Sequence, residues 1–412
     1  MGDILFLAHR VPFPPDRGDK MRSYHLLRHL SDLARVHLAT FADDDHDIVH
    51  AEALRPLLGS LHVEKRSRSQ LKAGIAALGS RRPVSLALFD SPAMRAAVDS
   101  ALARHDVDTI FAFSGQMAQF VPPDYGRRFV MDFVDIDSAK FTAYAAQGSG
   151  PMRWINRREG ALLGDFERAI ASRADVSLFV SEAEAALFRA DSGLDEDRVQ
   201  FLENGIDLEF YDPLADFPRL SASQRGQGAL IVFTGQMDYR PNVEAVVAFA
   251  TRTLPSIRAD FPFAHFAIVG RNPDAQVRAL ATQPGVTVTG AVPDVRSWLG
   301  SADVVVAPLR MARGIQNKVL EGMAMVRPVV ASPAAFEGID ATPGVHLIVA
   351  DPSEEANAVK ALIGDRAHAR AIATNGRARV EARYGWGARL AGLAALVGRE
   401  AEPTTHEIED AA

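Results

Sequence analysis

Short apolar runs alternate along the chain with longer stretches of helical periodicity. A stretch with Met21, Tyr24, Leu27 and Leu30 at helical spacing follows the first run and a loop. The apolar runs of this half are Ile4–Ala8, Val36–Phe41, Asp108–Phe113, Phe129–Phe133 and Val176–Val180. Runs of this kind are typical of strands buried on both faces, so the pattern predicts a parallel sheet covered by helices.

The second half of the chain repeats this plan. Its apolar runs are Leu230–Thr234, His265–Val269, Val286–Thr289, Val304–Ala307, Val329–Ala331 and Leu347–Val349. Between the halves, Tyr211–Gln227 gathers prolines, glycines and polar residues, which is typical of a linker. The sequence therefore predicts an α/β protein of two doubly wound, Rossmann-like domains. Their ligands are expected in the cleft between the domains, outside the carboxyl ends of the strands.

These patterns also set the expected boundaries. The first domain is expected over residues 1–210 and the second over residues 227–385. Residues 386–399 are expected to form a helix that packs back on the first domain. The acidic and polar residues 400–412 are expected to be a disordered tail.

Composition narrows the class of protein. The length of 412 residues suits two domains, and the net charge of -7 argues against a general nucleic-acid binder. The absence of cysteine excludes disulfides, Cys-ligated zinc and thiol catalysis. The N-terminal apolar run is too short for a signal peptide, and no stretch reaches the roughly 18 apolar residues that span a bilayer. We therefore expect a cytoplasmic protein.

The segment Pro308–Glu321 carries the most informative chemistry. It follows an apolar run and leads into a predicted helix, Lys318–Met325. Gly314 lets the backbone approach a ligand closely, and the free amides of a helix start suit a phosphate. Lys318 adds a positive charge, and Glu321 can accept two hydroxyl hydrogen bonds, as a ribose diol requires. The alternative is an ordinary helix start with a surface lysine and glutamate.

Further motifs follow one another in a fixed order over about residues 4–390. They are His9-Arg10-x-Pro12-x-Pro14-Pro15, Gly18-Asp19-Lys20-x-Arg22-Ser23-Tyr24-His25-Leu26-Leu27, Asp132-Phe133-Val134-Asp135-x-Asp137-Ser138, Ser181-Glu182-Ala183-Glu184, Glu203-Asn204-Gly205-Ile206-Asp207, Phe233–Asn242, Gly290-x-Val292-x-Asp294, Ala302–Pro308 and Gly314–Lys318. This ordered set resembles glycosyltransferase family 4 and its relatives of the GT-B fold. It is most similar to the sugar transferases associated with exosortase (PEP-CTERM) exopolysaccharide systems.

The resemblance implies a nucleotide-sugar site in the second domain. Glu321 matches the glutamate that holds the donor ribose. Gly314 and Ile315 match the turn whose backbone amides face the diphosphate or sugar. Val292 matches the position whose backbone meets the nucleobase, and Gly235 belongs to the motif that opens this domain.

The resemblance also implies residues that act on the donor phosphates. Arg240 and Lys318 are the basic candidates for the diphosphate, and Gly18 lies in the first-domain loop that closes over it. His9 and Asp135 each follow a predicted strand and are polar candidates for the cleft. For His9 a structural hydrogen bond, and for Asp135 a strand-end cap, remain open as alternatives.

One position departs from the family pattern. Family 4 enzymes commonly carry Glu-x7-Glu, but Arg313 stands eight positions before Glu321. Arg313 either contacts the diphosphate or is a surface residue. The missing first glutamate motivates an alternative hypothesis, a non-catalytic nucleotide-sugar-binding subunit of a polysaccharide assembly complex. A nucleotide-sugar epimerase of the same fold is a further alternative.

The main hypothesis is a retaining glycosyltransferase that uses a nucleotide-diphosphate sugar in exopolysaccharide or cell-envelope biosynthesis. Backbone amides, arginine and lysine can stabilise a leaving phosphate without a metal, so no metal and no cofactor are expected. The run Asp43–Asp47 and the pattern Asp135-x-Asp137 resemble metal motifs. The first lies in a predicted polar loop, and the second occurs in the wrong architecture, so neither is expected to bind metal.

Two basic segments concern the acceptor, which is expected to be a glycan or a polyprenyl-linked sugar. They are Lys65–Arg82 and Arg153–Arg158, each with interleaved apolar residues. Such segments either lie on an anionic membrane surface or form a solvated helix. The polyprenyl-linked acceptor favours a peripheral contact with the inner face of the plasma membrane.

Overall fold

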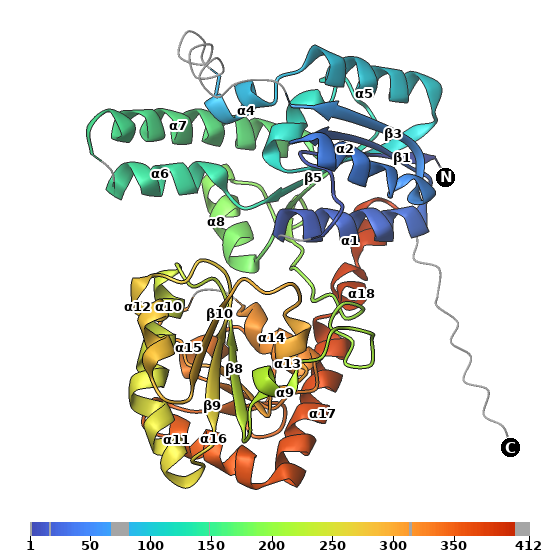
Figure 1. The fold of residues 1–412 in the computed structure, drawn as a ribbon. Helices are drawn as coiled ribbons and strands as arrows, with labels where there is room; N and C mark the ends of the chain where they lie inside the picture. The colour runs from blue at the N-terminus through green and yellow to red at the C-terminus, as the bar shows by residue number, and fades with distance from the viewer. Residues whose placement is uncertain (1, 16–17, 67–81, 148, 313–314, 400–412) are drawn as a thin grey trace, which may run out of the picture. The chain divides into compact units, whose positions relative to one another are not determined.

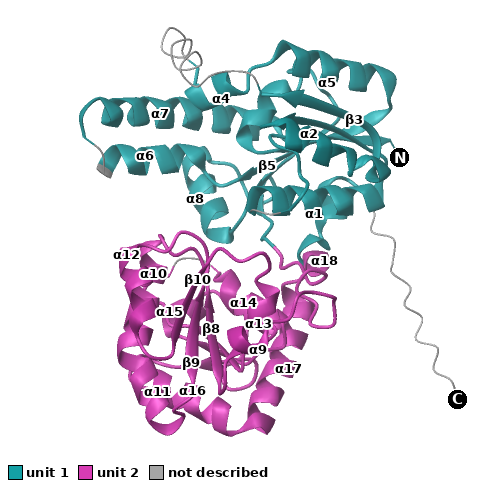
Figure 2. Cartoon of the chain, in the orientation of Figure 1, with its two compact units in different colours: residues 1–204, 389–412 teal, residues 205–388 magenta. Residues whose placement is uncertain are grey.

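The computed structural model describes residues 2–15, 18–66, 82–147, 149–312 and 315–399 (Figure 1). The chain divides into two compact units, which are drawn in different colours in Figure 2. Unit 1 comprises residues 1–204 and 389–412, and unit 2 comprises residues 205–388. Each unit contains one parallel sheet flanked by helices, which confirms the predicted α/β class.

The sheet of unit 1 has seven strands in the order β3-β2-β1-β4-β5-β6-β7. The strands are β1 (Asp3–Ala8), β2 (Val36–Ala42), β3 (Leu58–Lys65), β4 (Val107–Phe113), β5 (Arg128–Val134), β6 (Val176–Phe179) and β7 (Val199–Phe201). Ala8 pairs with both Thr40 and Phe113, so β1, β2 and β4 end at one edge of the sheet. The five inner strands match the predicted apolar runs, whereas the edge strands β3 and β7 were not predicted.

Helices and short 3₁₀ turns connect the strands of this sheet. They are α1 (Gly18–Leu33), α2 (Asp45–Glu52), the 3₁₀ turn η1 (Arg55–Leu57), α4 (Val84–Leu88), α5 (Pro92–Arg104), the 3₁₀ turn η2 (Gly115–Phe120), α6 (Asp137–Gln147), α7 (Gly150–Arg173) and α8 (Glu182–Ser192). Leu26, Leu27 and Leu30 bury the apolar face of α1. The same helix also buries Arg22, whose partner Asp132 lies on β5. An ion pair is thus built into the core of unit 1.

The sheet of unit 2 has six strands in the order β10-β9-β8-β11-β12-β13. They are β8 (Leu230–Thr234), β9 (His265–Val269), β10 (Val286–Gly290), β11 (Val304–Ala307), β12 (Val329–Ala331) and β13 (Ile348–Val349). All six correspond to predicted runs. The strand order reverses direction between β8 and β11, and ligands of doubly wound folds bind at such a switch point.

The helices of unit 2 include short pieces around the linker and long pieces against the sheet. They are α9 (Ala222–Arg225), α10 (Arg240–Ala248), the π-helical turn η3 (Phe249–Thr253), α11 (Leu254–Asp260), α12 (Ala275–Ala279), the 3₁₀ turn η4 (Leu280–Thr282), α13 (Arg296–Leu299), α14 (Asn317–Ala324), α15 (Pro333–Phe336), α16 (Glu355–Gly364) and α17 (Arg366–Arg383). Apolar residues of these helices and strands form one continuous core. The helix predicted over Lys318–Met325 is α14.

The last described residues belong to unit 1. After α18 (Trp386–Leu390) the chain forms α19 (Leu393–Leu396). Arg399 donates to both carboxylate oxygens of Asp108, at 2.6 and 2.8 Å, and Arg128 donates to the Leu396 carbonyl at 2.8 Å. These bonds fasten the segment to the sheet of unit 1. The predicted tail, residues 400–412, lies outside the described residues.

The acidic run Asp43–Asp47 forms a helix start, whereas a polar loop was predicted. Asp44 caps α2 by accepting a hydrogen bond from the Asp47 amide at 2.9 Å. The Asp47 side chain is buried and binds the Lys20 ammonium at 2.7 Å. The prediction was wrong here because aspartates also favour the first turn of a helix, where they cap its free amides.

Val326 is strained, and this gives a testable prediction. Its φ of 51° lies in the left-handed region, which costs a residue with a Cβ about 1–2 kcal/mol. Glycine reaches this conformation without strain, although it loses roughly 0.5–1 kcal/mol through backbone entropy. Val326→Gly should therefore be more stable than Val326→Ala, which keeps the strained Cβ, by up to about 1.5 kcal/mol in urea unfolding. Equal stability of the two variants would contradict the strain.

Candidate functional site

A pocket of about 510 Å³ opens at the carboxyl ends of the strands in unit 2. It lies next to β8, β9 and β10 and reaches the start of α14, which follows β11. Its walls therefore include the switch point of the sheet. The pocket is lined by Tyr211, Thr234, Gly235, Gln236, Asn242, Val269, Gly270, Arg271, Ala291, Val292, Val295, Ile315, Asn317, Lys318 and Glu321.

Two glycines let the ends of β8 and β9 meet closely at this pocket. Thr234 pairs with Val269, so Gly235 and Gly270 follow at the same level. A Cβ on Gly270 would lie 1.6 Å from the Gly235 carbonyl oxygen. No side chain fits such a gap, and Gly270 is therefore required for the backbone approach that shapes the pocket wall.

Glu321 lies one turn into α14 and lines the pocket. The Thr234 hydroxyl lies 3.4 Å from one carboxylate oxygen, and the Tyr211 hydroxyl donates to the same side chain. Burial raises the pKa of Glu321, while Tyr211, the Lys318 charge and Thr234 act in the opposite direction. The carboxylate is thus held in place by two hydroxyl donors and keeps acceptor capacity for a ligand.

Lys318 lies in the first turn of α14 and is the cation nearest to this glutamate along the helix. Its ammonium donates to the Asn242 side-chain oxygen at 3.1 Å and lies 5.3 Å from the centre of the Phe233 ring. Burial lowers the pKa of Lys318, and Glu321 partly offsets this. Asn242 is itself buried and donates to the Gln236 carbonyl at 2.9 Å, so the lysine is well positioned.

The basic residue predicted at the start of α10 does not line this pocket. The Arg240 side chain is 82% exposed and pairs with Glu244 one turn along the same helix at 2.7 Å. Instead, Arg271 in the loop after β9 is a basic residue that lines the pocket. Sequence reasoning missed Arg271, although its place directly after a predicted strand and Gly270 was a usable signal.

The remaining predicted residues of the second domain divide into two groups. Gly235, Val292 and Ile315 line the same pocket as Lys318 and Glu321. Arg313 and Gly314 lie outside the described residues. Tyr211 also lines the pocket but was missed, because it is the first residue of the predicted linker and nothing in the pattern connects it to α14.

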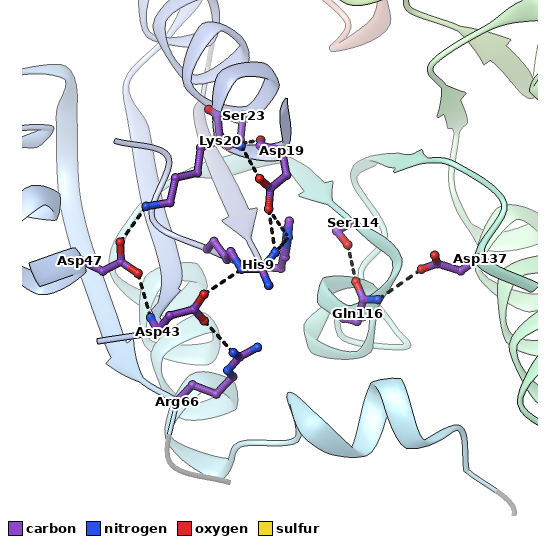
Figure 3. A network of polar contacts seen from close by, with 11 residues as sticks. His9, Asp19, Lys20, Ser23, Asp43, Asp47, Arg66, Ser114, Gln116 and Asp137 are labelled. Carbon is purple, nitrogen blue, oxygen red and sulfur yellow. Dashed lines mark hydrogen bonds and ion pairs between the residues drawn. The ribbon is translucent and has the colours of Figure 1, made fainter. Parts of the chain in front are cut away.

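In unit 1, His9 belongs to a network of polar contacts that also includes Asp19 and Asp43 (Figure 3). His9 follows β1, stacks on Phe113 with 5.6 Å between ring centres, and lies 3.4 Å from Asp19. Burial lowers the pKa of His9, so its neutral form is favoured. Asp19 also accepts from Arg10 at 2.7 Å, and Arg10 in turn binds Asp43.

Gly18 and Asp135 make fewer contacts. Gly18 is the first residue of α1, and a Cβ there would have nothing within 4 Å, so space does not demand a glycine. Asp135 is exposed just beyond the end of β5. The nearby Asp137 accepts a hydrogen bond from Gln116 at 3.3 Å, and burial raises the pKa of Asp137.

Comparison with solved structures confirms the GT-B fold. Sucrose-phosphate synthase from Thermosynechococcus elongatus superposes with a TM-score of 0.63 at 18% identity, over 96% of this chain and 98% of that one. Anabaena Alr3699/HepE, solved in complex with UDP, superposes with a TM-score of 0.62 at 16% identity, over 96% and 99% of the chains.

Comparison of sequences points to the class of enzyme. Residues 228–365, which contain the pocket's strands and α14, match the family of glycosyl transferases group 1. A phosphatidyl-myo-inositol mannosyltransferase from Propionibacterium freudenreichii is 30% identical over 169 residues. This match spans 40% of this chain and 39% of that relative's length. Within the described residues, no helix combines the length and apolar character needed to cross a membrane.

Proposed function

We propose that this protein is a glycosyltransferase that takes a sugar from a nucleotide-diphosphate donor held in the pocket of unit 2. The observation that carries the proposal is the pairing of Glu321 and Lys318 on one helix start, inside a pocket at the switch point. The family match over residues 228–365 supports the reaction class. UDP bound to the structurally similar Alr3699/HepE supports a nucleotide in this fold.

Four of the pocket residues have a proposed role toward the donor. The Glu321 carboxylate accepts two hydrogen bonds from the ribose diol. Lys318, Arg271 and the free amides at the start of α14 hold the diphosphate and stabilise the charge that develops as the sugar leaves. The Val292 backbone meets the base. These cations supply the positive charge that the leaving phosphate needs, which supports a metal-independent reaction.

The stereochemistry and the acceptor are also part of the proposal. We propose that the reaction retains the anomeric configuration, with the leaving phosphate assisting deprotonation of the acceptor. His9 and Asp135 are the proposed acceptor-side residues of unit 1. The acceptor is a glycan or a lipid-linked sugar, and the sequence resemblance to exosortase-associated transferases supports a place in exopolysaccharide or cell-envelope biosynthesis.

The test begins with a thermal-shift panel of nucleotide sugars on the full chain. A rise in Tm with one donor should be followed by transfer of its labelled sugar to lipid-extracted cell-envelope acceptors. Donor binding without transfer or hydrolysis would instead indicate a binding subunit. Release of an epimerised sugar without acceptor would indicate an epimerase. A panel that shifts nothing would refute the donor site.

The two basic residues predicted for the diphosphate should behave differently. Lys318→Met should weaken donor binding roughly 10- to 30-fold, because a half-buried charge-assisted contact of about 2 kcal/mol is lost. Arg240→Met should stay within about 2-fold of the wild type, since a screened surface pair contributes little. Isothermal titration with the selected donor measures both. Equal losses in the two variants would show that Arg240 reaches the donor.

We also propose a peripheral membrane contact on α7. Trp154 is 59% exposed, and Arg153 and Arg157, which flank it along the helix, are exposed as well. An aromatic ring among arginines suits the interface of an anionic bilayer. The other basic segment, Lys65–Arg82, lies mostly outside the described residues.

The α7 contact can be measured by co-sedimentation with vesicles that contain anionic lipid. Removing both arginines, Arg153→Ala with Arg157→Ala, should weaken binding roughly 30-fold, at about 1 kcal/mol for each charge. A control that removes two exposed arginines elsewhere, Arg252→Ala with Arg278→Ala, should bind like the wild type. Equal sedimentation with neutral and anionic vesicles at physiological salt would rule the contact out.

A further inference from the structure

Unit 2 contains a second, larger pocket at the opposite edge of its sheet. It has a volume of about 870 Å³ and is bounded by the residues just before β8, β9, β11 and β12, together with α16 and α17. The first pocket lies where strands end, whereas this one lies where strands begin. A ligand bound here would therefore not compete with one in the first pocket.

Four arginines give this second pocket its charge. Arg366 and Arg370 stand one turn apart on α17, and Arg225 and Arg327 contribute from segments that precede strands. Two lining residues are acidic, and both are engaged: Asp260 binds Lys360 at 2.9 Å, and Asp303 binds Arg225 at 2.6 Å. The lining thus carries two more positive than negative charges, in a chain whose net charge is -7.

Three of these arginines have guanidinium N–H groups available to donate to a ligand. Arg366 and Arg370 are exposed, and neither forms an ion pair with any residue that the structure describes. Arg327 donates to the Ala302 carbonyl at 3.2 Å, but its Nε is buried and has no partner among the described residues. Buried polar atoms without a partner are rare in folded proteins, and an anion in this pocket would give the Arg327 guanidinium a further acceptor.

Apolar residues form another part of the pocket wall. Phe261 is partly buried against the core, and the neighbouring Phe263 is 70% exposed. The backbone of this loop is held against Gly228, where a Cβ would lie 2.4 Å from the Phe263 carbonyl oxygen. On α17, the small residues Ala369 and Ala373 lie on the same face as the arginines and leave room beneath them.

We propose that this second pocket is a binding site for an organic phosphate, with the phosphate held by the arginines and an apolar or planar group against Phe261 and Phe263. Guanidinium groups match phosphate oxygens in pairs, and an arginine that lacks an anion gains most from one. A bare inorganic anion would leave the aromatic wall exposed. The proposal does not depend on the function proposed for the first pocket.

The test compares four probes by isothermal titration on the full chain. Inorganic pyrophosphate supplies charge alone, geraniol supplies only the apolar group, and geranyl diphosphate and AMP each combine the two. The titrations use the Lys318→Met protein, because this substitution removes a positive charge that lines the first pocket and so reduces any phosphate binding there. Geranyl diphosphate or AMP should bind at least 10-fold more tightly than pyrophosphate, and geraniol should not bind. The tighter of the two organic phosphates identifies an isoprenoid or a nucleotide source.

Charge reversal then locates the site. Arg366→Glu with Arg370→Glu, added to Lys318→Met, should reduce binding of the preferred probe at least 10-fold. The matched control Arg252→Glu with Arg383→Glu reverses the same charge on unit 2 outside this pocket and should leave binding unchanged. The four substituted arginines, Arg366, Arg370, Arg252 and Arg383, are all exposed. Thermal unfolding would verify that the variants fold. Equal binding in the two double reversals would overturn the site, and equal affinity for pyrophosphate and both organic phosphates would overturn the role of the aromatic wall.

Discussion

Replacing Glu321 with glutamine is expected to weaken donor binding about 100-fold. The amide has the size of the carboxylate, but it carries no charge and offers only one acceptor oxygen to a ribose diol. Loss of charge-assisted hydrogen bonds to both hydroxyls corresponds to about 3 kcal/mol, which is roughly two orders of magnitude in Kd. Isothermal titration with the nucleotide sugar selected by the thermal-shift panel measures this directly.

A matched control separates this effect from a loss of charge on the unit as a whole. Glu337→Gln removes an exposed carboxylate of unit 2 and should leave the Kd unchanged. The pH dependence provides a second check. Since burial raises the pKa of Glu321, donor binding by the wild type should weaken as the pH falls through that raised value. Glu321→Gln should lack this dependence. Near-wild-type affinity in Glu321→Gln would refute the ribose assignment.

The largest expected loss of stability comes from Arg22. Its Nε donates to Asp132 at 2.9 Å, and its Nη1 donates to the Leu202 carbonyl at 2.6 Å and the Asn204 side chain at 3.0 Å. Both members of the ion pair are almost fully buried, at 1% and 0% side-chain exposure. Arg22→Met should cost unit 1 about 3–5 kcal/mol, because it leaves Asp132 as an uncompensated buried charge.

The pH dependence distinguishes this mechanism from a simple packing defect. Burial raises the pKa of Asp132, and the Arg22 guanidinium counteracts that rise. Without the guanidinium the pKa rises further, so the folded variant takes up a proton more readily than the unfolded chain. Its stability deficit in urea should therefore shrink as the pH falls toward the ordinary aspartate pKa of about 4. The double variant Arg22→Met with Asp132→Leu should recover much of the stability at pH 7. A deficit that is independent of pH would point to packing alone.

The sequence predicted the inner strands of both sheets, because these strands are buried on both faces. Such strands are continuous apolar runs, as in Leu230–Thr234. The edge strand Leu58–Lys65 was not predicted because Gly59, Ser60 and His62 interrupt its apolar pattern. An edge strand is only partly buried, so its sequence can include such residues. The apolar pattern follows burial, so it predicted the buried inner strands of both sheets, whereas the edge strands β3 and β7 of unit 1 were missed.

Helical geometry alone could bring together only the part of the candidate site that is local in sequence, whereas Gly235 and Val292 were predicted from the family resemblance. Lys318 and Glu321 share one helix start, so their proximity follows from helical geometry. Arg271 and Tyr211 reach the same pocket from distant segments, and only the folded sheet brings them there. Arg240 illustrates the converse: it stands close to pocket residues in sequence, but its place at the first position of α10 directs the side chain to Glu244.

Unit 2 is an insertion within unit 1, and this has a consequence for biosynthesis. The Ile206 amide donates to the Tyr384 carbonyl at 2.6 Å, so the two ends of the inserted unit lie side by side. A chain that leaves the ribosome can complete unit 2 while unit 1 still lacks Arg389–Arg399. The ion pair of Asp108 cannot form until Arg399, nearly 300 residues later in the chain, has been synthesised. The unit begun first is therefore completed after the inserted one, and a nascent chain lacks the Asp108–Arg399 ion pair until residue 399 has emerged.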